Sequence, residues 1–507
     1  MATVRWNIFA NFLGGAWAAV LTLVIIPVQI KILGMEAFAL VGLIATLQIV
    51  FNVLDLGLSA TINRSVASDV SNNHEHSREI IQTAATLYWG IALVIGGVLG
   101  SQAGWVADNW FKLEKLSPAT VRLGIQIIAL SLALRWPVAL YAGVISGLQR
   151  LEILNLLKSA VITVRLLGGV LIVLVFRDLT IFLIWIGVSA AIEIVSYVTV
   201  CCRLMPQLSL RPFFSLSAVK EVWQFSLGMN LIAVLAMVLT QTDRIMISKL
   251  MTMEMLGFYF LAYNTAIGIV LIQGAINTAM FPSYASDYGI ASDGVLTSRH
   301  NKATQITVYL VALPAFALIF FGHDILSVWV SPVAADGAYL ALGILAFGSL
   351  LNAAVSNCYT IATASGHPYM VMKANILGVL LYVPGLYWLI LSHGILGAAL
   401  AWVFLNFYYL VSVLPMVQKS ILNQSAIQWL RGNLLPFMGL GLVTFGGVRL
   451  LLSFYGGDQL VMVLTAFTVS TVIYAFAGYL LLNPSLKTDI GIFLRQIIRG
   501  ASIRSVN

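Results

Sequence analysis

Apolar residues dominate this chain in long runs that are separated by short polar breaks. A membrane-spanning helix needs about 20 mostly apolar residues, and the sequence contains about fourteen segments of that kind. The pattern therefore predicts an all-α integral membrane protein. The predicted spans are 8–30, 37–60, 81–104, 121–146, 155–176, 181–202, 222–243, 258–281, 303–322, 338–362, 371–391, 394–417, 433–454 and 460–482.

The composition supports a protein that is solvated mainly by lipid. Of the 507 residues, 60% are hydrophobic and 9% are charged, whereas about 25% of a soluble domain is charged. Pro27, Gln29 and Lys31 follow the first span instead of the small residues of a cleavage site, so we expect a retained anchor. The three cysteines have no spacing that suits a metal, and we predict no cofactor.

Basic residues predict the orientation in the membrane, because cytoplasmic loops retain Lys and Arg. Counted over alternating loops, about seventeen of the 27 Lys and Arg residues fall on the side that holds both termini. We therefore expect a multi-pass protein of the cell inner membrane with both termini in the cytoplasm. The segment from Lys487 to Arg504 alternates apolar and basic residues and is expected to lie on that membrane surface. This use of positive charge gives no indication of nucleic-acid binding.

A weak internal repeat appears at an offset of 218 residues. It aligns Met35-Glu36 with Met253-Glu254, and 67–69 with 285–287. It predicts two similar six-helix lobes in the same orientation around a central cavity, as in transporters built from parallel repeats, with two extra C-terminal helices. The expected divisions are an N-lobe at 1–212, a C-lobe at 213–420, and the last two helices with a basic tail at 421–507.

Charges within the predicted spans are the first candidates for a functional site, because an unpaired charge in a membrane is costly. Arg135 lies mid-span, directly before Trp136 and Pro137, and the proline should kink the helix there. Arg165 lies in the next span, and Lys158 precedes it on the same helix face, about 10 Å nearer the cytoplasm. These three cations are predicted to bind an anionic substrate.

Two carboxylates could balance these cations or couple transport to an ion. Glu193 shares a helix face with Ser189, Ser196 and Tyr197, and it could neutralise an arginine or accept a proton. Asp55 could serve likewise in H⁺ or Na⁺ coupling. Its position near a cytoplasmic helix end leaves an ordinary ion pair or solvation as the alternative.

Two stripes of polar residues recur at spacings of three and four, and each is predicted to face protein or water. In the second stripe, Asn352 and Tyr359 are predicted to bind substrate. For the neutral positions the alternative is interhelical hydrogen bonding. Asp243, Arg244 and Arg449 lie near the outer interface, where we expect them to snorkel. The stripes are Gln48, Asn52, Asp55, Ser59 and Asn63, and Ser349, Asn352, Ser356, Tyr359 and Thr363. The offset of 218 also places Gln273 and Asn277 against Asp55 and Ser59.

An amphipathic anionic passenger with an uncharged polar portion suits these groups. Guanidinium groups bind phosphate oxygens in a bidentate manner, whereas Asn, Gln, Tyr and Trp suit hydroxyls and sugar faces. A diphosphate attached to sugars is such a passenger.

Several short motifs resemble the Wzx-type polysaccharide or O-antigen flippases of the multidrug/oligosaccharidyl-lipid/polysaccharide superfamily. The similar stretches are Asn11 to Gly14, Ile32-Leu33-Gly34, Asp55-Leu56-Gly57-Leu58 followed by Arg64, Arg135-Trp136-Pro137, Gly147-Leu148-Gln149-Arg150, Gln241-Thr242-Asp243-Arg244 and Leu256-Gly257-Phe258-Tyr259. The resemblance implies a transporter that turns polyprenyl-diphosphate-linked oligosaccharide from the cytoplasmic to the periplasmic leaflet by alternating access, for cell-surface polysaccharide biosynthesis. It also implies a polymerase and a chain-length regulator as partners.

Two other functions fit the sequence less well. A cation-coupled exporter of small amphipathic molecules on the same fold would use Asp55 and Glu193 for coupling, but the related drug antiporters usually carry a carboxylate in the first helix, and 8–30 contains none. A membrane-embedded polymerase or glycosyltransferase would need a long external loop. The longest, 105–120, holds Asp108 and Glu114 at a spacing that does not favour paired catalysis, so no enzyme is predicted.

Overall fold

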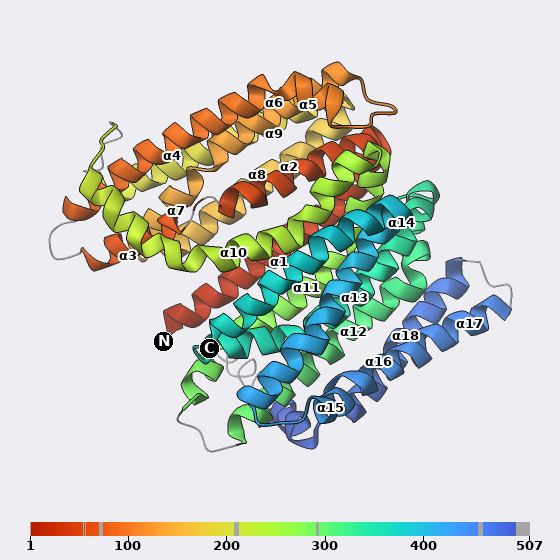
Figure 1. Ribbon diagram of the computed structural model, residues 1–507. Coiled ribbons are helices and arrows are strands. Elements are labelled where there is room, and N and C mark those ends of the chain that lie inside the picture. The colour runs from red at the N-terminus through yellow and green to blue at the C-terminus, as the bar shows by residue number, and fades with distance from the viewer. Residues whose placement is uncertain are drawn as a thin grey trace, which may run out of the picture. The chain divides into compact units, whose positions relative to one another are not determined.

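The computed structural model describes residues 2–53, 55, 57–69, 75–206, 212–289, 294–454 and 460–492. This described part of the chain is helical throughout and contains no β-strand, apart from an isolated bridge between Lys112 and Thr252 (Figure 1). The predicted surface helix from Lys487 to Arg504 falls largely outside the described residues. The all-α prediction is confirmed.

Internal contacts divide the chain into two compact units. Unit 1 comprises Met1–Leu261 and Leu386–Ile395, and unit 2 comprises Ala262–Gly385 and Leu396–Asn507. The lobe boundaries predicted from the sequence repeat stay predictions.

Unit 1 is a bundle in which helices distant in sequence pack side by side. Helix α1 packs on α8, α6 lies between α4 and α9, and α3 packs on α7 (Figure 1). Its core includes Tyr88 and Trp136, whose ring centroids are 5.0 Å apart. The helices are α1 (Ala2–Leu33), α2 (Met35–Val53), α3 (Leu58–Ser68), α4 (Glu75–Ser101), α5 (Ala103–Asn109), α6 (Pro118–Arg135), α7 (Val138–Gly147), α8 (Leu151–Phe176), α9 (Leu179–Leu204), α10 (Leu216–Leu250) and the start of α11 (Met253–Asp287).

Unit 2 is built around the long antiparallel pair of α12 and α13, against which α16 and α18 pack on the α12 side (Figure 1). Helices α12 and α13 contribute about half of its buried core cluster, including Ala312, Phe321 and Ala353. Its further helices are α12 (Val295–Trp329), α13 (Pro332–Ala364), α14 (Pro368–Ser420), α15 (Ala426–Trp429), the π-helical η1 (Leu430–Leu434), α16 (Leu435–Gly441), η2 (Leu442–Gly446), α17 (Gly447–Phe454) and α18 (Leu460–Leu481).

The number of membrane crossings agrees with the sequence. Twelve helices of the described chain are long and apolar enough to cross a membrane. Helix α14 is one of them, yet its 53 residues bend at Gly394, where φ is 57° and ψ is −135°. The apolar helix Val20–Leu33 lies within α1. With α14 crossing twice and α1 crossing once more, the helices accommodate about fourteen spans of about 20 residues each.

Two breaks within predicted spans determine where polar side chains lie. The predicted kink is confirmed: α6 ends at Arg135, and Pro137 is the N-cap of α7. The predicted continuous helix over 37–60 is wrong, because α2 ends at Val53 and α3 starts at Leu58. Gly57 has φ of 75°, a left-handed conformation that favours glycine and interrupts a helix. The first polar stripe is therefore divided between two helices.

Candidate functional site

A buried ion pair lies where the broken α6–α7 segment meets α9. The Arg135 Nε is 3.1 Å from the Glu193 Oε2, and the two side chains are only 6% and 15% exposed. The guanidinium donates further, longer hydrogen bonds to the Gln48 Oε1 at 3.4 Å and to the Ser189 Oγ at 3.2 Å. Arg135 is therefore the centre of a polar cluster drawn from α2, α6 and α9.

Pro137 explains how the chain places this arginine. Proline removes a backbone donor and its ring clashes with the preceding turn, so α6 ends at the arginine rather than continuing. Trp136, the C-cap of α6, is buried against Tyr88. The tryptophan thus anchors the break in the hydrophobic core, while the neighbouring Arg135 reaches the polar cluster.

Arg165 adds a second cation to this cluster. It lies on α8, is half-buried, and is close enough for its charge to act on Arg135. No ion pair involving Arg165 occurs in the described chain, so Glu193 balances one of two guanidinium groups. Lys158 lies on the same helix and is exposed. The structure therefore brings together Arg135, Arg165 and Glu193 with one positive charge in excess, and Lys158 stands apart from the pair.

Asp55 lies in the turn between α2 and α3 and contacts hydroxyls. Its Oδ2 accepts a hydrogen bond from the Ser59 Oγ at 2.7 Å, and its Oδ1 accepts one from the Tyr88 hydroxyl. No cation of the described chain forms an ion pair with it. Farther along the divided stripe, Asn63 donates to the Ser146 Oγ at 3.1 Å. Interhelical hydrogen bonding, one of the alternatives considered for this stripe, thus accounts for Asn63.

Unit 2 contains a neutral polar cavity of about 180 Å³. The two predicted residues Asn352 and Tyr359 both line it, and Tyr359 is 40% exposed. The Asn352 amide bridges two helices, accepting from the Gln273 Nε2 at 3.0 Å and donating to the Asn406 Oδ1 at 2.7 Å. The polar lining residues are Gln273, Asn277, Asn352, Ser356, Tyr359, Asn375 and Tyr409.

Some acceptors of this cavity have no protein partner. The Gln273 Oε1 and the Asn277 Oδ1 are buried without a hydrogen bond, and a buried polar atom left unpaired costs about 1–3 kcal/mol. Hydroxyl groups donate to such amide oxygens and accept from such amide N–H groups. The cavity is therefore chemically suited to a polyhydroxylated, uncharged ligand.

A third polar cluster in unit 1 was interpreted incorrectly from the sequence. Asp243 and Arg244 were expected to snorkel to the interface, but both are buried. The Tyr259 hydroxyl donates to the Asp243 Oδ2 at 2.6 Å, and the Arg244 Nη1 donates to the Gln241 Oε1 at 2.7 Å. The signal was present in the sequence, because the motifs 241–244 and 256–259 supply all four residues. Arg449 in unit 2 likewise pairs with Asp324 at 3.0 Å.

Known proteins resemble this chain in sequence. The "Putative O-antigen transporter" of Shigella flexneri is 22% identical over 408 residues, which cover 78% of this chain and 92% of that protein. The "Uncharacterized membrane protein EpsK" of Bacillus subtilis is 23% identical over 334 residues, covering 64% of this chain and 65% of that protein.

Solved structures share the fold. A structure titled "Lipid II flippase MurJ, inward closed conformation" has a TM-score of 0.72 at 12% identity and covers 96% of this chain and 99% of that one. An inward-facing multidrug resistance transporter of the MATE family and MOP superfamily has a TM-score of 0.57 at 15% identity, covering 82% and 96%. A family model described as "Polysaccharide biosynthesis protein" matches residues 4–286, more than half of the chain. The chain is therefore a member of the polysaccharide biosynthesis protein family, as the sequence motifs indicated.

Proposed function

We propose that this protein is a flippase that moves a polyprenyl-diphosphate-linked oligosaccharide from the cytoplasmic to the periplasmic leaflet by alternating access. The observation that carries the proposal is the Arg135 cluster, in which Glu193 pairs with Arg135 while the charge of Arg165 acts on the same group, within the membrane-spanning part of unit 1. An excess cation within the membrane spans is costly and marks a candidate binding site. The family match, the Shigella relative and the MurJ-like fold support the same function.

Arg135 can bind a diphosphate without losing its ion pair. Glu193 contacts the Nε edge, whereas both Nη groups make only the longer contacts to Gln48 and Ser189. Phosphate oxygens form stronger, charge-assisted hydrogen bonds with a guanidinium than neutral amide or hydroxyl oxygens do. A diphosphate would replace those two neutral acceptors and use the excess charge of Arg165. Lys158, exposed on the same helix, would attract the anion before it reaches Arg135.

The uncharged portion of the substrate is assigned to the chemistry of unit 2. Its cavity is lined by amide and phenol groups and by no charged side chain, and two of the amide oxygens accept no hydrogen bond from the described chain. Asn352 and Tyr359 are the residues we assign to sugar hydroxyls. A single sugar fits a volume of about 180 Å³, so the cavity would read one residue of the glycan.

The remaining assignments follow from this function. We also propose that both termini lie in the cytoplasm of a cell with an inner membrane, as the distribution of Lys and Arg predicts, and that a polymerase and a chain-length regulator use the delivered substrate. Asp55 and Glu193 are assigned to coupling by H⁺ or Na⁺ or to charge balance. No catalytic step is required of the protein.

The test uses a strain that lacks this protein and measures where the lipid-linked oligosaccharide accumulates. A glycan-modifying probe added to the periplasmic side should fail to reach the accumulated lipid, and wild-type protein should restore access. Arg135→Gln and Arg165→Gln should fail to restore it, whereas Arg177→Gln should succeed, because Arg177 is an exposed cation at the end of the same helix as Arg165. Accumulation that the periplasmic probe does reach would indicate a polymerase defect and refute the flippase.

An exporter of small amphipathic molecules is the second candidate, because the MATE transporters share the fold and Asp55 is a carboxylate with hydroxyl partners and no ion pair in the described chain. In that case the strain would accumulate no lipid-linked oligosaccharide. Export of a cationic dye by reconstituted protein would instead depend on an ion gradient and be lost in Asp55→Asn.

A further inference from the structure

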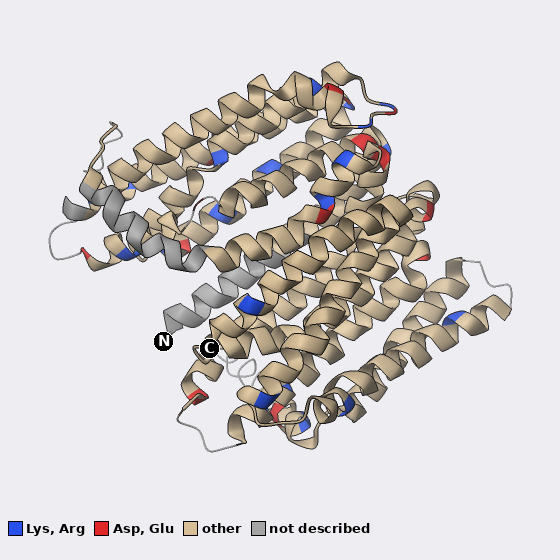
Figure 2. Ribbon diagram, in the orientation of Figure 1, with Lys and Arg blue, Asp and Glu red and all other residues tan. Residues whose placement is uncertain are grey.

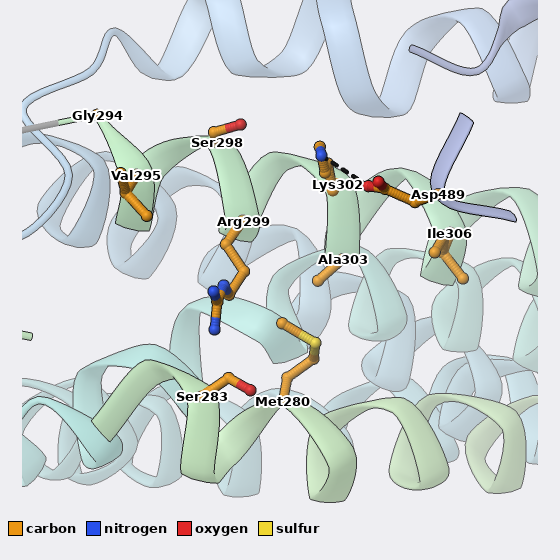
Figure 3. A pocket seen from close by; sticks show the side chains of 10 residues that line it. All are labelled: Met280, Ser283, Gly294, Val295, Ser298, Arg299, Lys302, Ala303, Ile306 and Asp489. Carbon is orange, nitrogen blue, oxygen red and sulfur yellow. Dashed lines mark hydrogen bonds and ion pairs between the residues drawn. The ribbon is translucent and has the colours of Figure 1, made fainter. Parts of the chain in front are cut away.

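A second polar cavity of unit 2 lies at the C-terminal end of α11. The proposed transport path does not explain it. It has a volume of about 620 Å³ and lies between the last turns of α11, the first turns of α12 and the segment after α18 (Figure 3). Its polar lining comes from Ser283, Ser298, Arg299, Lys302 and Asp489. These polar residues lie outside the apolar runs 258–281, 303–322 and 460–482 that are predicted to cross the membrane, so we infer that the cavity lies at the membrane surface.

The two cations of this cavity have donors available. The Arg299 Nε is 3.0 Å from the Asp287 Oδ2, and no hydrogen bond of its two Nη groups is recorded within the described chain. Figure 3 shows the guanidinium pointing across the cavity toward Ser283 and Met280 on α11. The Lys302 Nζ donates one of its three N–H groups to the Asp489 Oδ2 at 2.7 Å. An anion in the cavity could thus accept from both side chains.

Asp287 and Asp489 hold the two cations in position, but they do not cancel the positive charge that faces the cavity. Asp287 is only 15% exposed and holds the far edge of the Arg299 guanidinium, which leaves the Nη edge facing the open space. Asp489 is 57% exposed, so water screens its charge. The N-terminal amides of the 35-residue α12 have no side-chain cap and add partial positive charge at Val295.

The surrounding end of unit 2 is positive. Of the Lys and Arg residues that the structure describes in this unit, all except Arg449 belong to the same ends of the helices, and in Figure 2 blue segments gather where α15 begins. These residues are Arg299, Lys302, Lys373, Lys419, Arg431 and Lys487. A positive membrane-proximal surface attracts anionic lipids.

One wall of the cavity is apolar. Met280, Ala303 and Ile306 line it beside the two cations, and Figure 3 shows Met280 on the α11 side opposite them. A small soluble anion would leave this wall in contact with water. A phosphate that is attached to a hydrocarbon chain satisfies both the cationic and the apolar groups.

We propose that this cavity binds the phosphate group of an acidic membrane lipid, with the Arg299 Nη groups and Lys302 as the donors and the α11 wall beside the first part of the lipid chain. Basic pockets between helices at a membrane surface bind lipid head groups in this way. The site is separate from Arg135, and it does not depend on whether the protein flips a lipid.

The test measures lipid adducts of the full-length protein by native mass spectrometry in a neutral detergent. Three probes are titrated: farnesyl diphosphate, phosphatidylglycerol and inorganic diphosphate. The wild type should bind at least one of the two lipids more tightly than inorganic diphosphate. Tighter binding of farnesyl diphosphate would identify diphosphate lipids as the ligand, whereas equal or tighter binding of phosphatidylglycerol would identify lipid phosphates in general, and either result supports the site.

Two variants of the cavity should change the lipid affinity in opposite directions. Arg299→Gln should weaken lipid binding about ten-fold, because a charge-assisted contact is lost. Asp489→Asn should strengthen it about two-fold by freeing Lys302. Arg431→Gln is the matched control, since it removes an exposed arginine at the same end that does not line the cavity. Equal lipid binding in the wild type and Arg299→Gln, or no preference for lipid over inorganic diphosphate, would overturn the proposal. The phosphatidylglycerol adduct reports on this cavity, whereas access of the periplasmic probe to the lipid-linked oligosaccharide reports on the Arg135 cluster, so failure of this site and failure of the flippase proposal are distinguishable.

Discussion

Neutralising both members of the Arg135–Glu193 pair should distinguish their effect on the stability of the fold from their effect on transport. In Glu193→Gln the Arg135 guanidinium, whose side chain is 6% exposed, keeps only the neutral acceptors Gln48 and Ser189. Breaking a buried pair by removing one partner typically costs about 3–5 kcal/mol. Glu193 is 15% exposed, so we expect the lower end of that range, about 3 kcal/mol. Arg135→Gln should cost less, because the remaining carboxylate is the more exposed partner.

The double variant Arg135→Gln/Glu193→Gln should recover most of this stability. Two amides can hydrogen-bond at the same separation without a buried charge, and replacing a buried pair by neutral groups is often close to neutral. The expected coupling free energy between the two positions is therefore about 2–3 kcal/mol. Transport should not recover, because no cation remains at 135 to bind the diphosphate.

Stability is measured on full-length protein in mixed micelles by titration with SDS, and transport by access of the periplasmic probe to the lipid-linked oligosaccharide. A matched control pair is Asn63→Ala with Ser146→Ala, a neutral interhelical contact whose coupling should stay near 0.6 kcal/mol. Restored transport in the stable double variant would refute the assignment of Arg135 to the substrate. Loss of transport without any coupling in stability would refute the ion pair.

Three further predictions concern the end of unit 1 that holds the segment between α5 and α6. Glu36 is buried, and its carboxylate accepts hydrogen bonds from the backbone N–H groups of residues 114–116 at 2.7–3.0 Å. Glu36→Ala should lower the free energy of unfolding by about 2 kcal/mol or more and speed proteolysis of that loop, and unchanged cleavage would contradict this prediction. A Cβ at Gly257 would lie 2.5 Å from the Met35 backbone oxygen, so Gly257→Ala should lower stability by about 1–3 kcal/mol, measured as the midpoint of thermal unfolding, while Gly268→Ala, at a position with open space, should not. The hydrogen bond and charge of Glu254 raise the pKa of the exposed Lys115, so the stabilisation of this pair is complete below the ordinary lysine pKa and is lost as pH rises through the raised value. Glu254→Gln should therefore shift acylation of Lys115 to lower pH, and an unchanged acylation profile would show that the pair does not form.

The fold class could be predicted from hydropathy alone, because a span in lipid must satisfy its own backbone hydrogen bonds and therefore appears as a long apolar run. The kink at Pro137 was equally accessible, since proline acts on its own helix. The break at Gly57 was missed, although Asp55-Leu56-Gly57 is a local signal. Apolar residues continue on both sides of it, and a hydropathy pattern does not register a left-handed glycine.

The candidate site shows which parts of a site the sequence leaves open. Composition singled out Arg135, Arg165 and Glu193, because charges are rare within spans, but not which carboxylate pairs with which arginine. Asp243 and Arg244 were misjudged for the converse reason. Their position near a span end suggested snorkelling. Gln241 lies one turn before Arg244 on α10 and could have been found from its spacing, whereas the contact of Asp243 with Tyr259 of α11 depends on the packing of the two helices.

The hydrogen-bond chains of the two units indicate why the internal repeat is faint in the sequence. In unit 1 the chain runs from Gln48 to Arg135 to Ser189, and in unit 2 it runs from Gln273 to Asn352 to Asn406. The central residue and its last partner are 54 positions apart in both, and the two central residues differ in number by 217, within one of the repeat offset.

The central residue is an arginine only where a carboxylate, Glu193, lies beside it, because a cation without that partner would be a buried charge in the membrane. The cavity of unit 2 has no charged lining residue, and there an amide takes the same place. The first partners do not correspond in this way, because Gln273 lies 225 positions after Gln48, so the two chains share the 54-residue step and not every partner. The proposed substrate, which combines a charged diphosphate with neutral sugars, matches this difference between the polar groups of the two units.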